Sequence, residues 1–428
     1  MQYDLAIIGA GWAGFNAAVL ARKLGLKTVL IEKSELGGTC LNRGCIPTKT
    51  LIQSAKIFSL VKKSANFGID SVAPQINFLK IQERKQKIMT GLRQAMQSGL
   101  KDIEYIASEA RFTSDKSIKT SQGNIDFKSA LIATGSVPFE LPGFKFSDKV
   151  ISSDAMLELD RIPSSLLVIG GGVIGCEFAS LFCALGSKVT IAEKLPNLLP
   201  TEDIEIAKKL ENTFKKKGIK VITSADASKL DLNTFEKVLA SVGRKPNLEG
   251  LDLENAGIKI ENNKIIIDDF LKTSTQNIYA AGDCTAKVML AHFAAYQGEL
   301  AVENIAGKAP VKFDTTVVPN CIFTDPQIAS VGLNEDKAKE SNIAIDIKKF
   351  DYMGSGMARI IDETDGFIKL VIAKDSEKLL GASIIGPGAT ELISGLTIAV
   401  KSGLALKDLR SIIFAHPTLS EIIAEAIK

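Results

Sequence analysis

Short apolar runs that end in glycine recur along the chain, and two of them repeat one pattern. Residues 3–8 (Tyr-Asp-Leu-Ala-Ile-Ile) predict a buried strand that leads into the glycine cluster 9–14 and then into an alanine-rich helix. Residues 166–169 lead in the same way into the glycine cluster 170–175 and a second helix. Each copy therefore predicts a strand, a tight glycine turn and a helix.

Both clusters read G-x-G-x-x-G, and each is followed by a second strand that ends in an acid. Gly9 to Glu32 and Gly170 to Glu193 both span 23 positions. Incidental glycines in ordinary βαβ turns would not need an acid at the same distance twice. The glycines permit a tight turn and close approach of a pyrophosphate to the helix N-terminus, and the carboxylate accepts hydrogen bonds from ribose hydroxyls. The sequence predicts two dinucleotide sites, of which the second favours NAD over NADP because Glu193 would repel a 2′-phosphate.

Further strands also end in glycine or acid. Residues 130–136 form an apolar run that stops at Thr134 and Gly135, and residues 237–244 repeat that design. Residues 277–283 predict a strand that delivers Asp283 at its carboxyl end, where ligands of open α/β sheets lie. Asp283 is interpreted either as a ligand of a polyol or ribityl chain or as a helix cap.

The last part of the chain, from about residue 313, changes character. Residues 366–373 and 379–385 predict a β-hairpin. A helix follows whose apolar face is formed by Leu392, Ile393, Leu396, Ala399 and Val400. This pattern predicts a separate α+β domain with antiparallel strands.

The length, composition and net charge exclude several classes of protein. At roughly 150 residues per domain, 428 residues predict about three domains. The 46% hydrophobic and 24% charged content is typical of a globular protein, and a net charge of +3 argues against nucleic acid or a membrane surface as partner. No long unbroken apolar run and no basic N-terminal segment is present in the sequence, so we expect a cytoplasmic protein.

The cysteines indicate chemistry and not a disulfide scaffold. Only Cys40 and Cys45 are close in sequence, and we expect no metal site because no C-x-x-C pair occurs. In an ideal helix their Cα atoms would lie about 8.7 Å apart, whereas a disulfide needs less than about 7 Å. Gly44 and Pro47 supply the helix distortion that a bridge requires. The two cysteines are therefore either a redox pair or two small buried hydrophobes.

Near the other end of the chain, His416 and Glu421 lie within one and a half helical turns. A carboxylate that accepts from one ring nitrogen fixes the tautomer and leaves the other nitrogen to take a proton from a thiol. A structural His–Glu contact is the alternative. His416 is nevertheless one of only two histidines in the chain.

Taken together, these motifs resemble the pyridine nucleotide-disulfide oxidoreductases, most closely their dihydrolipoamide dehydrogenase branch. The resemblance runs nearly from end to end in the order expected of the family. It rests on the redox box 37–49 with its Ile-Pro-Thr-Lys ending, on 133–135, on 281–283, on 290–292 and on 416–421.

The resemblance implies an α/β fold with two Rossmann-like dinucleotide-binding domains, for FAD and NAD, and a C-terminal α+β dimerisation domain. The implied domains are an FAD domain (1–145), an NAD domain (146–248), a central segment that completes the FAD domain (249–312) and an interface domain (313–428). The NAD domain is shortened, because only about sixteen residues separate Val221 from Val238, where the family carries an extra β-meander.

The resemblance also implies the cofactor residues. Lys49 would lie beside the flavin ring and Glu177 by the nicotinamide. The FAD set is Gly9, Gly11, Gly14, Glu32, Lys33, Gly38, Thr39, Lys49, Ala110, Thr134, Gly135, Asp283 and Ala291. The NAD set is Gly170, Gly172, Val173, Ile174, Gly175, Glu177, Glu193 and Gly243.

The implied reaction is oxidation of dihydrolipoyl groups. Cys45 would face the flavin and Cys40 would exchange with substrate. His416, supported by Glu421, would act as the base and reach Cys40 of the other subunit, which requires a homodimer. The implied partner is the lipoyl domain of a 2-oxoacid dehydrogenase acyltransferase or the H protein of glycine cleavage.

Two other functions remain alternatives. One is an FAD-dependent NAD(P)H reductase of another low-molecular-weight disulfide. Residues 421–428 contain no cysteine, unlike the C-termini of mercuric reductases and large thioredoxin reductases. The other is a non-catalytic flavin-binding scaffold, against which the presence of Cys40, Cys45, His416 and Glu421 argues.

Overall fold

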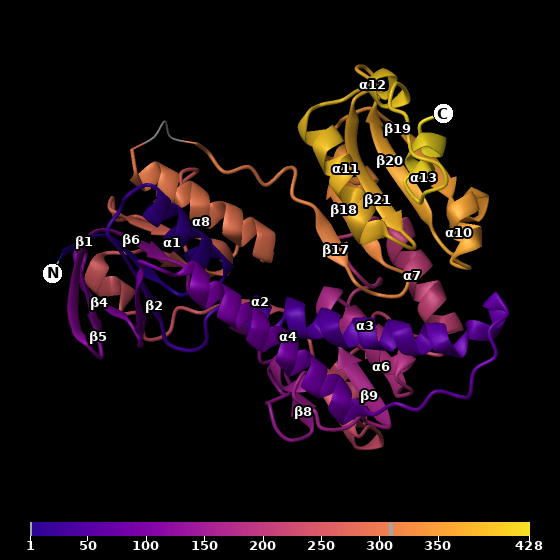
Figure 1. Cartoon of the computed structure of the whole chain (residues 1–428), viewed down its shortest axis with the longest axis horizontal. Coiled ribbons are helices and arrows are strands. Elements are labelled where there is room, and N and C mark those ends of the chain that lie inside the picture. Colours follow the sequence, from indigo (N-terminus) through magenta and orange to yellow (C-terminus); the bar gives the residue numbers. More distant parts are fainter. Residues whose placement is uncertain (1, 308–310) are drawn as a thin grey trace.

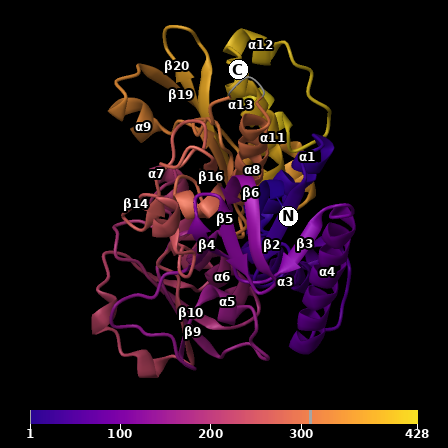
Figure 2. The same cartoon turned by 90° about the vertical axis from the view of Figure 1, so that its left-hand side faces the viewer.

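The computed structural model describes residues 2–307 and 311–428. An N-terminal sheet, a middle sheet and a C-terminal sheet lie side by side, each with its own helices (Figure 1). The turned view in Figure 2 shows the C-terminal sheet above the other two. Within the described residues, none of the helices combines the length and apolar character that a membrane crossing requires.

The N-terminal sheet is built largely from parallel strands. Its order is β3 (Glu104–Ala107), β2 (Thr28–Glu32), β1 (Gln2–Ile8), β6 (Gly123–Ile132), β5 (Ser117–Thr120) and β4 (Arg111–Ser114). Strand β16 (Ile278–Ala280) pairs in parallel with β6, so the chain returns to this sheet after the middle one. Helices α1 (Trp12–Lys23) and α8 (Ala291–Ile305) pack against each other.

Strand β1 shows why the predicted apolar run forms the centre of this sheet. Leu5 and Ile7 belong to one apolar cluster and Ala6 and Ile8 to another, and all four are buried. A central parallel strand has both faces covered, so its sequence is apolar without alternation.

The middle sheet is parallel throughout. Its order is β11 (Lys220–Ile222), β10 (Lys188–Ala192), β9 (Ser165–Ile169), β12 (Lys237–Ala240) and β8 (Val150–Ile151). Its helices are α5 (Ser153–Met156), α6 (Val173–Ala184) and α7 (Ile204–Lys216). The interval between β11 and β12 forms two 3-10 turns, η2 (Ala227–Lys229) and η3 (Leu232–Thr234), and no strand is assigned in this described segment.

Three helices cross the centre of the molecule between these sheets (Figure 1). They are α2 (Gly38–Arg43), α3 (Cys45–Lys62) and α4 (Phe78–Gly99), with the short turn η1 (Ser64–Phe67) after α3. Helix α3 contacts both α4 and α6, so the redox box touches the unit that carries the second glycine loop.

The C-terminal sheet is antiparallel, in the order β17 (Asn320–Ile322), β18 (Ile328–Gly332), β21 (Leu379–Ile385), β20 (Phe367–Ala373) and β19 (Ile345–Asp351). The predicted hairpin is confirmed as β20 and β21, and the predicted helix as α11 (Ala389–Lys401). The shorter helices are α9 (Glu335–Glu340), α10 (Gly356–Ile360), α12 (Leu406–Arg410) and α13 (Glu421–Ala426), with the turn η6 (Tyr352–Gly354).

The two faces of this sheet have different partners. Ile368 and Leu370 share an apolar cluster with α11, α12 and α13. Phe367 and Ile385 instead share a cluster with residues of the middle sheet and its helices. Alternate residues of one strand point to opposite faces, so the C-terminal domain is packed directly onto the middle unit.

Short pairings complete the structure. Strand β7 (Ser136–Pro138) pairs antiparallel with β13 (Arg244–Pro246), and this pair ties the end of β6 to the segment that follows β12. Strands β14 (Ile260–Glu261) and β15 (Lys264–Ile265) form a small hairpin, flanked by the 3-10 turns η4 (Leu253–Ala256) and η5 (Gly282–Thr285).

Candidate active site

A cavity of about 1320 Å³ runs along the carboxyl ends of β1, β6 and β16 and past the redox helices. Its wall contains nearly all the residues that the sequence predicted for FAD. They are Gly9, Gly11, Glu32, Lys33, Gly38, Thr39, Lys49, Ala110, Thr134, Gly135, Asp283 and Ala291. Cys40 and Cys45 line the same cavity.

The remaining predicted cofactor residues divide into two groups. Val173, Ile174 and Glu177 of the second set line the cavity. Outside its lining lie Gly14, Gly170, Gly172, Gly175, Glu193 and Gly243. Gly14 lies beneath the first loop, where an added Cβ would be 1.8 Å from the Gly9 carbonyl oxygen.

Glu32 and Glu193 make the same contacts in their two units. Glu32 accepts hydrogen bonds from the backbone N–H of Ala10 at 2.7 Å and of Ser34 at 2.8 Å. Glu193 accepts from the N–H of Gly171 at 2.6 Å and of Leu195 at 2.7 Å. Each acid therefore anchors its own glycine loop.

The first glycine loop fits a dinucleotide. Gly9 has φ +101°, and a Cβ there would lie 2.4 Å from the Ala133 carbonyl oxygen, so a side chain is excluded. Gly11, the N-cap of α1, offers no capping side chain, which leaves the N-terminal N–H groups of the helix for an anion. At the same wall, Thr134 Oγ1 is buried without a hydrogen-bond partner among the described residues. These available hydrogen-bond donors match a bound pyrophosphate and its sugar.

Asp283 lies in η5, directly after β16, and does not cap that turn, whose N-cap is Ala281. Its Oδ2 accepts from the Ser136 hydroxyl at 2.6 Å, and Arg244 Nε donates to that hydroxyl at 2.9 Å. Burial raises the pKa of Asp283. Sequence reasoning missed Ser136 and Arg244. The signal available was that each follows the glycine at the end of a predicted strand.

The redox box is bent where the sequence predicted a distortion. Helix α2 ends at Arg43 and α3 begins at Cys45, with Gly44 between them at φ −150° and ψ −112°. A Cβ on Gly44 would lie 3.1 Å from the Thr39 carbonyl oxygen and 3.4 Å from the Cys40 Cα, so glycine allows this close passage.

The two thiols are free and interact with each other. A hydrogen bond from Cys40 lowers the pKa of Cys45 to about 7; burial opposes this shift and Lys49 supports it. The hydrogen bond with Cys45 and burial raise the pKa of Cys40. This pairing, in the wall of a cavity, supports the redox interpretation over that of two inert buried cysteines.

Lys49 links three parts of the molecule beside Cys45. Its Nζ donates to both carboxylate oxygens of Glu177, at 2.8 and 2.7 Å, and lies 4.8 Å from the centre of the Phe323 ring. Glu177 Oε1 also accepts from the Phe323 N–H at 2.9 Å. The Glu177 side chain is buried, so a cation and an anion face each other in the wall of the cavity.

His416 and Glu421 form the predicted pair, with 2.8 Å between His416 Nδ1 and Glu421 Oε1. Glu421 Oε2 accepts from the Thr418 N–H at 3.0 Å. The hydrogen bond with His416 lowers the pKa of Glu421. The His416 side chain is 80% exposed and lies outside the lining of the cavity that holds Cys40.

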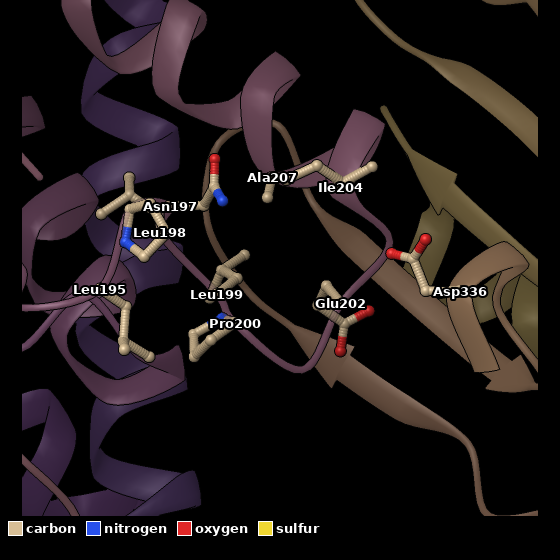
Figure 3. Close-up of a pocket in the computed structure, with 10 residues that line it drawn as sticks. Leu195, Asn197, Leu198, Leu199, Pro200, Glu202, Ile204, Ala207 and Asp336 are labelled. Atoms are coloured by element: carbon tan, nitrogen blue, oxygen red, sulfur yellow. The ribbon is translucent and has the colours of Figure 1, made fainter. Parts of the chain in front are cut away.

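A second cavity, of about 380 Å³, lies between the loop after β10 and α9 (Figure 3). Leu195 and Leu198 to Pro200 come from that loop, and Glu202 and Asp336 add carboxylates. Glu202 Oε1 accepts from the Asn320 side-chain amide at 2.7 Å. Across the described residues, no group of three or more His, Cys, Asp or Glu side chains is arranged to hold a metal ion.

Comparison with protein families decides the class. The model described as "Pyridine nucleotide-disulphide oxidoreductase" matches residues 3–298, and the dimerisation-domain model of that family matches residues 318–427. The chain belongs to the pyridine nucleotide-disulphide oxidoreductases. The predicted resemblance and the predicted α/β fold are confirmed, as is the family's use of FAD and NAD. The C-terminal match to a dimerisation domain supports a homodimer.

Several similar oxidoreductases are known. The chain is 39% identical to the dihydrolipoyl dehydrogenase of Bacillus subtilis, covering 99% of this chain and 97% of that protein. It is 37% identical to the Chlamydia pneumoniae dihydrolipoyl dehydrogenase, covering 99% and 96%.

Solved structures of similar fold support the same family. The HOCl-induced flavoprotein disulfide reductase RclA of Escherichia coli superimposes with a TM-score of 0.90 at 30% identity, covering 100% of this chain and 99% of that one. LpdA of Mycobacterium tuberculosis superimposes with a TM-score of 0.92 at 26% identity, with the same coverage.

Proposed function

We propose that this protein is a dihydrolipoyl dehydrogenase, which oxidises dihydrolipoyl groups to lipoyl groups with NAD. The observation that carries the proposal is the pair Cys40 and Cys45 in a cavity that residues of both nucleotide units line. Lys49 and Glu177 form an ion pair in the wall of the same cavity. The dihydrolipoyl dehydrogenases that match over nearly the whole chain support this substrate.

The base in this reaction is His416. Glu421 accepts from Nδ1, which fixes the tautomer and leaves Nε2 to take a proton from a dihydrolipoyl thiol. Because His416 is exposed and lies outside the cavity that contains Cys40 of its own chain, it would serve Cys40 of the second subunit. The match to a dimerisation domain supports that arrangement.

The thiol steps follow from disulfide exchange. The substrate thiolate attacks the Cys40 sulfur of the Cys40–Cys45 disulfide, which forms a mixed disulfide and releases the Cys45 thiolate. The second substrate thiol then loses its proton and attacks the substrate sulfur bound to Cys40, which closes the lipoyl ring and releases Cys40. FAD, when bound, supplies the two-electron carrier between the reduced cysteines and NAD.

The residues around these sulfurs would bind and orient the two nucleotides and stabilise the reactive thiolate. The first glycine loop, Glu32, Thr134 and Asp283 would hold FAD, and the second loop with Glu193 would hold NAD. Lys49 stabilises the Cys45 thiolate, which lowers the pKa of that thiol. The remaining residues of the predicted FAD and NAD sets complete these two sites.

The physiological partner in this proposal is a lipoyl domain of a 2-oxoacid dehydrogenase acyltransferase or the glycine cleavage H protein. Either presents a lipoyl group on a flexible arm, which suits a redox pair reached through a cavity. The proposed location is the cytoplasm, where free thiols stay reduced.

The test is turnover of dihydrolipoamide with NAD by the FAD-loaded dimer and by its Cys45→Ser variant. The proposal expects NAD-dependent turnover that the variant loses, together with a long-wavelength absorption band when dihydrolipoamide is added anaerobically. A flavin that NADPH reduces but dihydrolipoamide leaves oxidised would contradict it.

The second candidate is a reductase of another low-molecular-weight disulfide. The similarity to a flavoprotein disulfide reductase favours it. Glu193 argues against NADPH as its donor. A scaffold without catalysis would bind flavin equally well with Cys45→Ser and show no turnover with either substrate.

A further inference from the structure

The indole of Trp12 lies beside the redox pair. Trp12 is the one tryptophan in the sequence, and it begins α1 directly after Gly11. The starts of α1 and α2 are closely packed, because a Cβ on Gly38 would lie 2.8 Å from the Gly11 Cα. Trp12 and Cys40, two residues after Gly38, line the same cavity.

The indole N–H of Trp12 has no hydrogen-bond partner among the described residues. Its Nε1 is buried, and no described atom meets the full distance and angle of a hydrogen bond to it. Cys40 faces the same cavity, and the influence of Trp12 lowers the pKa of the Cys40 thiol against the opposing effects of Cys45 and burial. A buried indole N–H usually finds an acceptor, and thiolate sulfur is a far better acceptor than thiol sulfur.

We propose that Trp12 is a positioning residue that donates its indole N–H to Cys40 when Cys40 is a thiolate. The proposal rests on the proposed function, in which Cys40 exchanges with substrate. It adds a residue from the first nucleotide unit to the thiol chemistry.

The step that Trp12 assists is release of Cys40 from the mixed disulfide. His416 removes the proton of the second substrate thiol, and that sulfur attacks the substrate sulfur bonded to Cys40. The new bond closes the lipoyl ring, the bond to Cys40 breaks, and its electron pair stays on Cys40 as a thiolate. A donor aimed at this sulfur stabilises the leaving group, and in reverse it holds the attacking thiolate.

The experiment compares Trp12→Phe with the unchanged protein in the FAD-loaded Cys45→Ser background, where Cys40 has no partner thiol. The pH dependence of Cys40 alkylation by iodoacetamide is measured. We expect Trp12→Phe to raise the Cys40 pKa by about one unit, which is about a tenfold loss of thiolate at a given pH below that pKa. An unchanged pKa overturns the proposal.

The matched control is Phe15→Leu on the same helix. Phe15 packs near Gly99 and does not line the cavity that contains Cys40, so its change tests the loss of α1 packing alone. We expect no shift of the Cys40 pKa. A shift as large as that of Trp12→Phe would mean that helix packing, and not the indole N–H, sets the thiol pKa.

A measurement without any change at Trp12 guards against a variant that fails to fold. Because the sequence contains one tryptophan, emission of the Cys45→Ser protein reports on Trp12 alone. We expect this emission to titrate with the same pKa as alkylation of Cys40. Emission that is flat across that range overturns the proposal.

Two further readouts separate the alternatives. If Trp12 instead binds the FAD pyrophosphate, Trp12→Phe weakens FAD retention and leaves the Cys40 pKa unchanged, which refutes the inference. In the Cys45-containing enzyme we expect kcat for dihydrolipoamide to fall about tenfold with little change in KM. Absence of dihydrolipoamide turnover in the unmutated enzyme refutes the proposed function, whereas the pKa shift in the Cys45→Ser background tests Trp12 independently of substrate.

Discussion

Lys49 Nζ lies 2.7 Å from Glu177 Oε2, and this ion pair joins the redox helix α3 to helix α6 of the second nucleotide unit. The two charges act in opposite directions on Cys45, because Lys49 lowers the pKa of that thiol and Glu177 raises it. The balance between them contributes to a Cys45 pKa of about 7.

Removing Lys49 and removing Glu177 should therefore move the Cys45 pKa in opposite directions. We expect Lys49→Met to raise it and Glu177→Gln to lower it, each by about one unit. Alkylation of the reduced protein as a function of pH measures the shift. In the unchanged protein the thiolate is protonated as pH falls through about 7, so alkylation should slow there. Shifts of the same sign would contradict this account of the pair.

The second prediction concerns the subunit that supplies the base. Cys40→Ser and His416→Gln should each be nearly inactive as homodimers. When the two variants are unfolded together and refolded, a mixed dimer regains one intact pair, Cys40 of one chain with His416 of the other. We expect about a quarter of the activity of the unmutated dimer, since half of the dimers are mixed and each of these has one working site out of two. No recovery would mean that His416 serves Cys40 of its own chain.

The second glycine loop allows a test that separates folding from nucleotide binding. A Cβ on Gly175 would lie 2.0 Å from the Gly170 carbonyl oxygen, whereas nothing lies within 4 Å of a Cβ on Gly172. Gly175→Ala should lower the free energy of unfolding by about 2 kcal/mol because of this overlap. Gly172→Ala should leave stability unchanged and raise the KM for NAD, because its methyl group occupies the path of the pyrophosphate. Denaturant unfolding and NAD kinetics measure the two effects.

Lys369 is the buried cation between the middle unit and the C-terminal sheet. Its side chain is 1% exposed, and Nζ lies 2.9 Å from Asp203 Oδ2 and 2.7 Å from Glu335 Oε2. Lys369→Met should lower the free energy of unfolding by about 3 kcal/mol, because it leaves the buried Asp203 carboxylate without a cation. The exposed Lys337 on α9 provides the control, and Lys337→Met should have little effect.

The same cluster predicts a pH dependence. Hydrogen bonds from Lys339 and Lys369 lower the pKa of Glu335 from 4.5 to about 2. A depressed carboxyl pKa stabilises the fold above the unfolded value, and this stabilisation is lost as pH falls from 4.5 towards 2. Acid unfolding of Lys369→Met should show a weaker loss across that range. An identical acid profile for the two proteins would remove Lys369 from the explanation.

Much of the fold was predictable because it depends on backbone conformation and apolar spacing within short segments. Gly9 needs φ +101°, which glycine tolerates, and an acid at the end of the next strand anchors the loop that contains it. The hairpin β20–β21 and the helix α11 follow from apolar spacing within single segments. The break at Gly44 was also readable, since a proline and a glycine in one helical stretch disfavour continuous hydrogen bonding.

The sequence by itself thus determined the two nucleotide loops, the redox box and the His416–Glu421 pair, each of which lies within a short stretch of chain. Only the tertiary structure decided that Glu177 faces Lys49 across 128 positions and that Arg244 reaches Ser136 across 108. It also placed Trp12 and Cys40 in the wall of one cavity, and it left His416 outside the lining of that cavity. The physical reason is that local backbone geometry is encoded by neighbouring residues, whereas contacts between distant segments depend on how the sheets and helices pack together.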